Sequence, residues 1–468
     1  MNSLSRPLFL PRSFHGFVVA VLCAAIVPLC AALDAPVSPG AQPAVGTLFT
    51  FLDQISGNYI LSGQQERAWD LNGLDFDVNY VVATTGKTPV VRGFDFLDYC
   101  YSPAMRATQT ASERAITWAQ NGGIVTFCCH MFMTIGSTNG QPQFYVPASG
   151  PGGQGTNFDI RQAVINGTPE NTEFLAKLDI IASELTKLRD AGVPVIWRPF
   201  HECSGGWFWW GAHGPTPFIQ AYRIMFNRFT QVYGLNNLIW VFNPTDSTTN
   251  MAAWYPGDDV VDLISYDVYP AAGTHPAFAT EYAQMRAFKS GRKVVTMSEN
   301  GAIPDPNQLF TGANWAYFCT WNGFENDLNQ NSVTFLQTVY NHPKVITLDE
   351  LPPLYVLFPV AFTAQPGNQT VAAGGSASFI AVAAGTPAPI VQWQRLPAGS
   401  GAWANVSEGG DYSGATKGTL VVSNSTTGMS GDQFRCVAAN SLSSAISNAA
   451  VLVVLVAPSN AVVTITVE

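Results

Sequence analysis

The spacing of apolar residues predicts that strands and helices alternate along most of the chain. Residues 123–130 (GIVTFCCH) form a short apolar run rich in β-branched and aromatic side chains. In Thr172–Ala191 apolar residues recur every three or four positions, which predicts an amphipathic helix that Gly192 and Pro194 end. A second helix opens at Thr216–Pro217, with proline at its first helical position. The pattern therefore indicates buried strands covered by helices.

This alternation continues far enough to predict a closed barrel. The candidate strands are Ile60–Glu66, Val90–Phe96, Gly123–His130, Val193–Glu202, Leu238–Pro244, Asp262–Tyr269, Val294–Gly301 and Trp315–Gly323. Eight strands that alternate with helices over roughly 300 residues are typical of an α/β fold of the (β/α)8 TIM-barrel type. The alternative is an open, doubly wound sheet. No strand is followed by a G-x-G-x-x-G or Walker loop, so a nucleotide-binding sheet has no support.

The composition changes after Pro352–Pro353. The rest of the chain is rich in Ala, Gly, Ser, Thr and Val, and its short alternating runs are separated by turn residues, as in an all-β sandwich. Trp393 and Cys436 resemble the immunoglobulin-like pattern, but Phe379 and Ala381 lie where the partner cysteine would be. An immunoglobulin-like domain without its inter-sheet disulfide is therefore predicted.

The N-terminus predicts export. Arg6 and Arg12 precede an apolar stretch from Gly16 to about Ala32, which is the layout of a secretory signal peptide. The alternative is an uncleaved membrane anchor, which Pro28 and the short length disfavour. We predict a secreted protein, extracellular or periplasmic, with this organisation: signal peptide 1–32, barrel domain 34–351, linker 352–364 and immunoglobulin-like domain 365–468.

Six cysteines remain after signal cleavage, and their sequence positions leave 15 disulfide pairings open. Cys128 and Cys129 precede His130, which raises the question of a metal site. Protein metal sites normally use a spaced pair such as C-x-x-C, which is absent here, so buried cysteines on a strand are the favoured interpretation.

Composition narrows the class of ligand. Only 12% of the 468 residues are charged, and their sum is −10, which argues against a nucleic-acid partner. The 12 Trp, 15 Tyr and 29 Phe exclude a disordered chain. No apolar run long enough to span a membrane follows the first 35 residues. We expect a monomer that is not associated with a membrane after signal cleavage. We expect its ligand to be neutral.

Two glutamates end apolar strands that face one another across the predicted barrel. Glu202 ends the fourth strand and Glu299 the seventh, and active sites of such barrels lie at the carboxyl ends of the strands. Paired carboxylates are what glycoside hydrolysis requires: one protonates the leaving oxygen while the other attacks the anomeric carbon or activates water. The cluster 207–210 (WFWW) directly after Glu202 supplies flat faces for sugar rings.

The segment 198–210 (RPFHECSGGWFWW) resembles the acid/base motif of glycoside hydrolase family 26, best known for β-1,4-mannanases. Blocks ILSGQQE, VRGFDF, LISYDVYP and TMSENG support the resemblance, which covers about Leu48 to Leu351. It implies that Glu202 is the acid/base and Glu299 the nucleophile of a retaining enzyme. It further implies a set of substrate-contacting residues: His130, His201, Trp207, Asp267, Tyr269 and Trp321.

Several of these residues have a plainer interpretation. His130 is alternatively a core histidine, and Trp321 a core aromatic; at least one of Trp209 and Trp210 is expected in the core. Arg92 and Asp95 are interpreted as a buried ion pair of the barrel rather than as substrate contacts.

The favoured function is a secreted, retaining endo-β-1,4-mannanase acting on mannan, glucomannan or galactomannan without a metal or organic cofactor. One alternative is the same machinery acting on β-1,3-xylan or mixed-linkage β-glucan. The other is a carbohydrate-binding or adhesion protein that has lost catalysis, against which the two intact glutamates argue.

Overall fold

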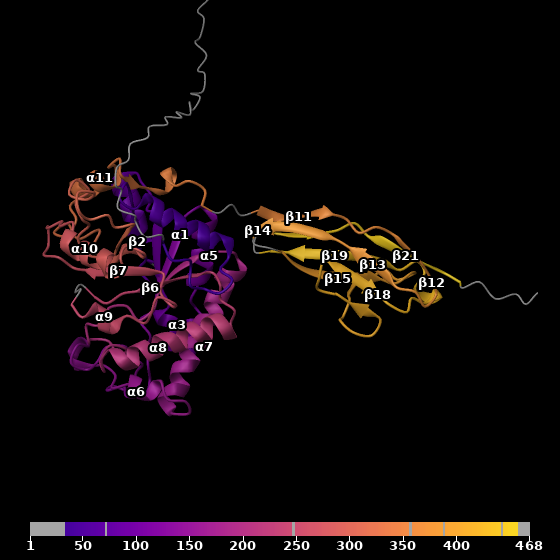
Figure 1. Cartoon of the computed structure of the whole chain (residues 1–468), viewed down its shortest axis with the longest axis horizontal. Coiled ribbons are helices and arrows are strands. Elements are labelled where there is room, and N and C mark those ends of the chain that lie inside the picture. The colour runs from indigo at the N-terminus through magenta and orange to yellow at the C-terminus, as the bar shows by residue number, and fades with distance from the viewer. Residues whose placement is uncertain are drawn as a thin grey trace, which may run out of the picture.

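The computed structural model describes residues 33–70, 73–245, 249–354, 358–386, 389–440 and 443–456. The predicted signal peptide, residues 1–32, lies outside the described residues. Within those ranges, no helix combines the length and the apolar character needed to cross a bilayer. A helix-covered barrel is followed by an elongated all-β part, as Figure 1 shows.

Eight parallel strands close into the predicted barrel, in chain order. They are β2 (Gly63–Gln65), β3 (Val91–Asp95), β4 (Ile124–Cys128), β5 (Val195–Arg198), β6 (Leu238–Phe242), β7 (Leu263–Val268), β8 (Val294–Asn300) and β9 (Phe318–Thr320). The register pair Gln64 and Thr320 joins the first strand to the last. Each of the eight strands lies inside one predicted strand, so the predicted barrel is confirmed.

Alternation along the strands builds two apolar layers. Ile124 and Ile196 point into the barrel and pack with the helix α1 (Pro43–Ile55), which closes its amino end. Their neighbours Val125 and Trp197 point outward to the surrounding helices. Because side chains alternate between faces of a strand, one apolar run fills both layers. Buried polar residues occur within the strands as well, such as Thr126, Ser265 and Thr296, and the charged ones Arg198 and Glu299 lie near the carboxyl ends.

The remaining helices cover the outside of the barrel: α2 (Phe76–Thr85), α3 (Leu97–Tyr101), α4 (Pro103–Arg106), α5 (Ala111–Gln120), α6 (Ile160–Ala163), α7 (Pro169–Asp190), α8 (Pro215–Asn227), α9 (Met251–Trp254), α10 (Ala279–Phe288) and α11 (Val333–Tyr340). A short parallel pair, β1 (Ile60–Leu61) and β10 (Val345–Ile346), lies beside them. Helix α7 begins three residues before its predicted start, because the Thr168 hydroxyl caps it by accepting from the backbone of Asn171.

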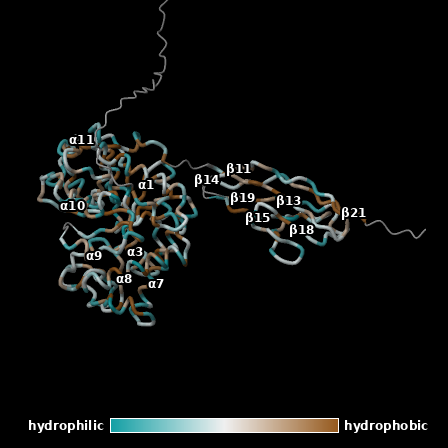
Figure 2. The backbone as a smooth tube through the Cα atoms, in the orientation of Figure 1, coloured by the Kyte–Doolittle hydropathy of each residue, from teal (hydrophilic) through white to brown (hydrophobic). Residues whose placement is uncertain are grey.

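The C-terminal part consists of β strands: β11 (Phe358–Ala364), β12 (Gln369–Ala372), β13 (Ala377–Ile380), β14 (Val382–Thr386), β15 (Ile390–Leu396), β16 (Ala404–Asn405), β17 (Tyr412–Ser413), β18 (Thr419–Val422), β19 (Gln433–Ala439), β20 (Ser444–Ile446) and β21 (Ala450–Leu455). The sheet β13-β18-β17 packs on the sheet β12-β21-β19-β15-β16 around a shared core. Apolar and polar positions mix along these strands (Figure 2).

The core of this part contains Trp393, which is fully buried, and Phe379, which stacks on Phe434 at 4.8 Å. Cys436 is a buried free thiol, as expected from the missing partner cysteine. Strand β11 falls within the predicted linker 352–364, so the all-β part begins at Phe358. The linker prediction overlooked it because this strand lies before the turn-separated alternating runs.

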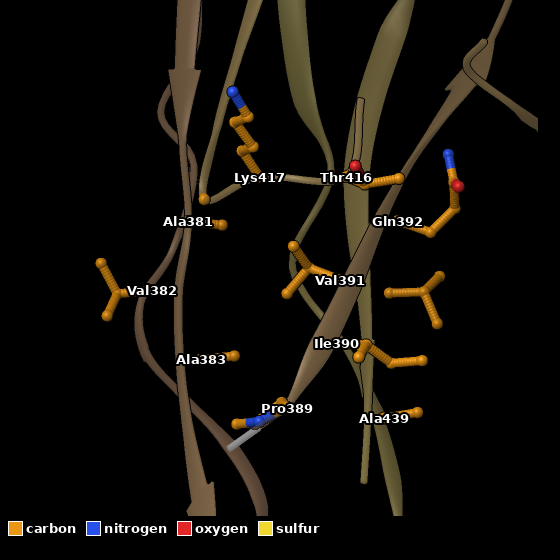
Figure 3. Close-up of a pocket in the computed structure, with 12 residues that line it drawn as sticks. Ala381, Val382, Ala383, Pro389, Ile390, Val391, Gln392, Thr416, Lys417 and Ala439 are labelled. Carbon is orange, nitrogen blue, oxygen red and sulfur yellow. The ribbon is translucent and has the colours of Figure 1, made fainter. Parts of the chain in front are cut away.

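The all-β part contains a cavity near the strands β14 and β15. Its volume is about 800 Å³, and small and apolar side chains such as Ala383, Ile390 and Val391 line it (Figure 3).

Candidate active site

The barrel brings the two predicted glutamates together at its carboxyl end. Glu202 follows β5 and Glu299 lies in β8. Oxygens of Glu202, Asp267 and Glu299 all lie within 4.8 Å of one another. The expected juxtaposition of the carboxylates across the barrel mouth is therefore present in the structure, with Asp267 of β7 beside them.

A tight backbone turn holds Glu202 in position. Phe200 and Glu202 both have positive φ, +46° and +52°, a conformation that residues other than glycine rarely adopt. The Glu202 amide donates to Asn243 Oδ1 at 2.6 Å, and Asn243 follows β6. The neighbouring strand therefore supports the turn that aims the Glu202 side chain.

The environment of Glu202 favours its protonated form. Burial, together with the nearby Glu299 carboxylate, raises the pKa of Glu202 to about 7. A hydrogen bond of 2.7 Å from Trp207 Nε1 to Glu202 Oε2 opposes this rise, because it stabilises the carboxylate. Near neutral pH this group can both donate and accept a proton.

Glu299 is held by donors on both oxygens. Arg198 donates to Glu299 Oε2 at 2.7 Å, and the Tyr269 hydroxyl donates to Glu299 Oε1. Arg198 also pairs with Asp267, which accepts in addition from Asn243 Nδ2 at 2.7 Å. The Arg198 guanidinium lies between two buried carboxyl groups and offsets the free-energy cost of burying the Glu299 carboxylate.

Two histidines form a buried chain beside the glutamates. His130 Nδ1 lies 2.6 Å from Asp95 Oδ2, and His130 Nε2 lies 3.1 Å from His201 Nε2. Burial lowers the pKa of His130, but Asp95 more than offsets this, so its pKa lies above the ordinary value. Burial and Arg198 hold the pKa of His201 well below its ordinary value.

The proposed pairing of Arg92 with Asp95 is wrong. Arg92 donates to Glu66 at 2.9 Å and to Asp75 at 2.6 Å, whereas Asp95 binds His130. Residues three apart on a strand point to opposite faces, so Arg92 and Asp95 cannot meet. Asp95 thereby becomes part of the candidate site.

The aromatic residues divide between site and core. Trp207 is half-buried and its ring passes over Gly205, where a Cβ would lie 2.3 Å from ring carbons. Trp321 follows β9 and its ring centroid lies 5.7 Å from that of His130. Trp209 and Trp210 are fully buried and donate to backbone carbonyls, so both belong to the core.

Comparison with known proteins identifies the family of this chain. Residues 37–350 match the model described as "Glycosyl hydrolase family 26". The chain belongs to glycosyl hydrolase family 26. A mannan endo-1,4-β-mannosidase of Thermothelomyces thermophilus is 40% identical over 323 residues, which are 67% of this chain and 62% of that protein. Mannan endo-1,4-β-mannosidase B of a Piromyces species is 33% identical and covers 71% of this chain and 56% of its own length.

Solved structures agree with this family-26 assignment. The GH26-CBM35 β-(1,4)-mannanase of Podospora anserina has a TM-score of 0.62 and 34% identity, and the match covers 71% of this chain and 72% of that chain. A β-mannanase from a symbiotic protist of the termite Reticulitermes speratus, complexed with a gluco-manno-oligosaccharide, has a TM-score of 0.63 and 34% identity, covering 69% and 99%. The chain spans less than two thirds of the length of the curated relatives named above.

Three further residues lie at this candidate site that were not among the predicted site residues. Arg198 and Asn243 end strands and were recognisable as polar strand ends, but the strand register decides which groups they meet. Tyr145 comes from the long segment after β4, and burial, together with the Glu202 and Glu299 carboxylates, raises its pKa. No periodic signal in the sequence marks Tyr145.

Among the residues that the structure describes, two groups of side chains have the composition of a metal site: Asp95, Cys128 and His130 in one, and Glu202, Asp267 and Glu299 in the other. In the first, Asp95 and His130 bind each other. In the second, the Arg198 guanidinium binds Asp267 and Glu299 and occupies the position of a counter-charge. A divalent cation would compete with these contacts, so neither group favours one.

Proposed function

We propose that this family-26 chain is a retaining endo-β-1,4-mannanase that acts by double displacement. The observation that carries the proposal is the spacing of its two glutamates. Retaining glycosidases hold their carboxyl groups about 5–5.5 Å apart, whereas inverting enzymes leave about 6.5–9.5 Å for a water molecule. Oxygens of Glu202 and Glu299 lie within 4.8 Å, which fits the retaining geometry.

Glu299 is the proposed nucleophile. Arg198 and Tyr269 hold its two oxygens, so its attacking atom is oriented before substrate arrives. Attack on the anomeric carbon forms a glycosyl ester and consumes the negative charge of Glu299. Arg198 keeps its contact with Asp267 during this step, because it pairs with both side chains.

Glu202 is the proposed acid in the first step and the base in the second. Its pKa of about 7 keeps it protonated in slightly acidic solution, ready to protonate the departing oxygen. When Glu299 is esterified, one cause of that raised pKa disappears. The pKa of Glu202 then falls, and its carboxylate can take a proton from the attacking water.

A neutral glycan would be held by stacking and hydrogen bonds. Trp321 is the proposed platform under the sugar being cleaved, and Trp207 flanks the leaving-group side. His130 binds Asp95 and His201 through its two ring nitrogens, and His201 Nδ1 is a buried atom without a hydrogen-bond partner among the described residues. Several relatives are named as mannan endo-1,4-β-mannosidases, which favours mannan over xylan or mixed-linkage glucan.

We also propose where the enzyme acts and how its domains are organised. Export by the N-terminal signal suits a polysaccharide too large to enter a cell. The C-terminal sheets, with a buried tryptophan between them, support an immunoglobulin-like domain appended to the barrel. A monomer is sufficient, because the proposed catalytic residues come from one chain.

The deciding experiment compares release of reducing sugar from β-mannan, β-1,3-xylan and mixed-linkage β-glucan. We expect mannan to be cleaved fastest, with internal cuts that lower viscosity before much reducing sugar appears. Glu202→Ala and Glu299→Ala should each lose several orders of magnitude of activity, and azide should partly restore Glu202→Ala on an activated substrate. Preferred cleavage of another glycan would reject mannan, and an inactive wild-type chain that still binds glycan would support the adhesion alternative.

A further inference from the structure

The outer face of the larger sheet in the all-β part carries a row of polar side chains. Arg435 of β19 pairs in register with Gln394 of β15, and Gln394 pairs with Asn405 of β16. Neighbours on these strands, Trp393 and Cys436, point the other way into the core. The three polar residues therefore lie side by side on the face directed away from the second sheet.

Hydrogen bonds fix this row. Arg435 Nε donates to Gln394 Oε1 at 2.9 Å, and Gln394 Nε2 donates to Asn405 Oδ1 at 3.0 Å. The Arg435 guanidinium carbon lies 4.2 Å from the centroid of the Trp403 ring. Each side chain is thus held by the next, which lowers the entropy lost when a ligand binds.

Trp403 is the aromatic side chain of this row that a ligand can reach. Its side chain is half-buried, and Arg435 lies over one face of the ring, so a ligand that stacks on Trp403 would use the opposite face. The other aromatic candidate for stacking, Tyr412, packs toward the core residue Phe434, with ring centroids 6.4 Å apart, and its hydroxyl is buried. Tyr412 therefore serves the core, and Trp403 serves the surface.

We propose that Trp403, Arg435, Gln394 and Asn405 form a binding platform for a neutral β-1,4-linked hexose chain. The flat CH face of an equatorially linked sugar stacks on the open face of the indole, and hydroxyl groups meet the amide and guanidinium donors beside it. A net charge of −10 on the chain disfavours polyanions.

This platform is distinct from the cavity between β14 and β15, which alanine, valine and isoleucine side chains line together with Gln392, Thr416 and Lys417. The choice of ligand rests on the proposed function. An enzyme that cleaves a polysaccharide stays close to its substrate when a second domain also binds that polysaccharide. Mannan and cellulose share the linkage and the flat sugar face, so either can occupy the platform.

The test measures depletion of the full-length protein from solution by insoluble mannan and, separately, by cellulose. The variants are Trp403→Ala, Trp403→Phe and Arg435→Met. The matched control is Ile390→Ala, which removes an exposed apolar side chain, 79% accessible, from the same sheet. All variants carry Glu299→Ala so that the polysaccharide stays intact, and near-ultraviolet circular dichroism verifies folding.

We expect Trp403→Ala to weaken binding about tenfold on at least one of the polysaccharides, because stacking on one aromatic ring contributes about this much. Trp403→Phe should retain part of the affinity, Arg435→Met should weaken it, and Ile390→Ala should match the parent. Equal affinity of Trp403→Ala and the parent on both polysaccharides would overturn the platform, as would equal losses in Trp403→Ala and Ile390→Ala. Because cellulose binding is read separately, a failure of mannanase activity leaves this test interpretable.

Discussion

The indole nitrogen of Trp207 donates a 2.7 Å hydrogen bond to Glu202, so a proposed sugar-stacking wall and the proposed acid are directly connected. This bond stabilises the ionised form of Glu202, while burial and Glu299 favour the protonated form. Trp207 therefore lowers the pKa of the acid, against the larger effects of burial and Glu299, in addition to any contact it makes with sugar.

Trp207→Phe should raise the pKa of Glu202 above its value of about 7, because the carboxylate loses a donor. The alkaline limb of the pH profile of kcat/KM should move to higher pH. An aryl mannoside whose leaving group needs no protonation serves as the control, since its first step does not depend on the acid. An unmoved limb on the natural substrate would show that the hydrogen bond does not control this pKa.

The two aromatic walls should differ in kinetics. Trp321→Ala should lower kcat strongly, because a contact with the distorted ring is made most strongly in the transition state. Trp207→Ala should raise KM for polymer more than for aryl glycosides, because the aryl substrate lacks the departing sugar. Equal and small effects of both substitutions would return these residues to a packing role.

Arg198 should be required for both activity and stability. Arg198→Met leaves Asp267 and Glu299 buried without their shared counter-charge. Removing one partner of a buried ion pair costs about 3–5 kcal/mol, so the free energy of unfolding in urea should fall by about that amount. Arg198→Lys should recover part of the stability but little activity, because lysine cannot bind both carboxylates with fixed geometry. Wild-type stability of Arg198→Met would contradict this role.

Glu202→Gln should stabilise the fold at neutral and alkaline pH. The pKa of Glu202 is raised from 4.5 to about 7, so the folded state binds more protons than the unfolded state between these values. Its contribution to stability is therefore present at low pH and lost as the pH rises through this window. Calorimetry should find the Tm advantage of Glu202→Gln growing between pH 4.5 and pH 8. A constant difference would mean that Glu202 is not strained when ionised.

Much of this fold was predictable because local periodicity carries it. Each barrel strand lies within a predicted strand, since strands buried on both faces leave uninterrupted apolar runs. The two glutamates were recognisable because they end such runs in a chain with few charges. Asp95 was misassigned because its partner, His130, depends on how β3 and β4 are aligned rather than on sequence distance. Strand β11 was missed because it lies before the turn-separated alternating runs that predict the all-β part.

The contacts of Arg198, Tyr145 and Trp403 could not be predicted from periodicity. Arg198 acts through residues on two other strands, and Tyr145 comes from a segment without regular structure. Trp403 lies outside a strand, beside β16, and meets Arg435 of β19 because β15 pairs with both of these strands. Such contacts are set by three-dimensional neighbours.

The central claim is that Glu299 attacks mannose at its anomeric carbon. A 2-deoxy-2-fluoro-β-mannosyl fluoride slows breakdown of the glycosyl-enzyme, so the ester accumulates and can be found by mass spectrometry of a peptic digest. The account predicts one fluoromannosyl group per chain, on the peptide that contains Glu299, and no label on Glu299→Ala. Label on the peptide of Glu202, or active wild-type enzyme that hydrolyses mannan with inversion and takes no label, would contradict it.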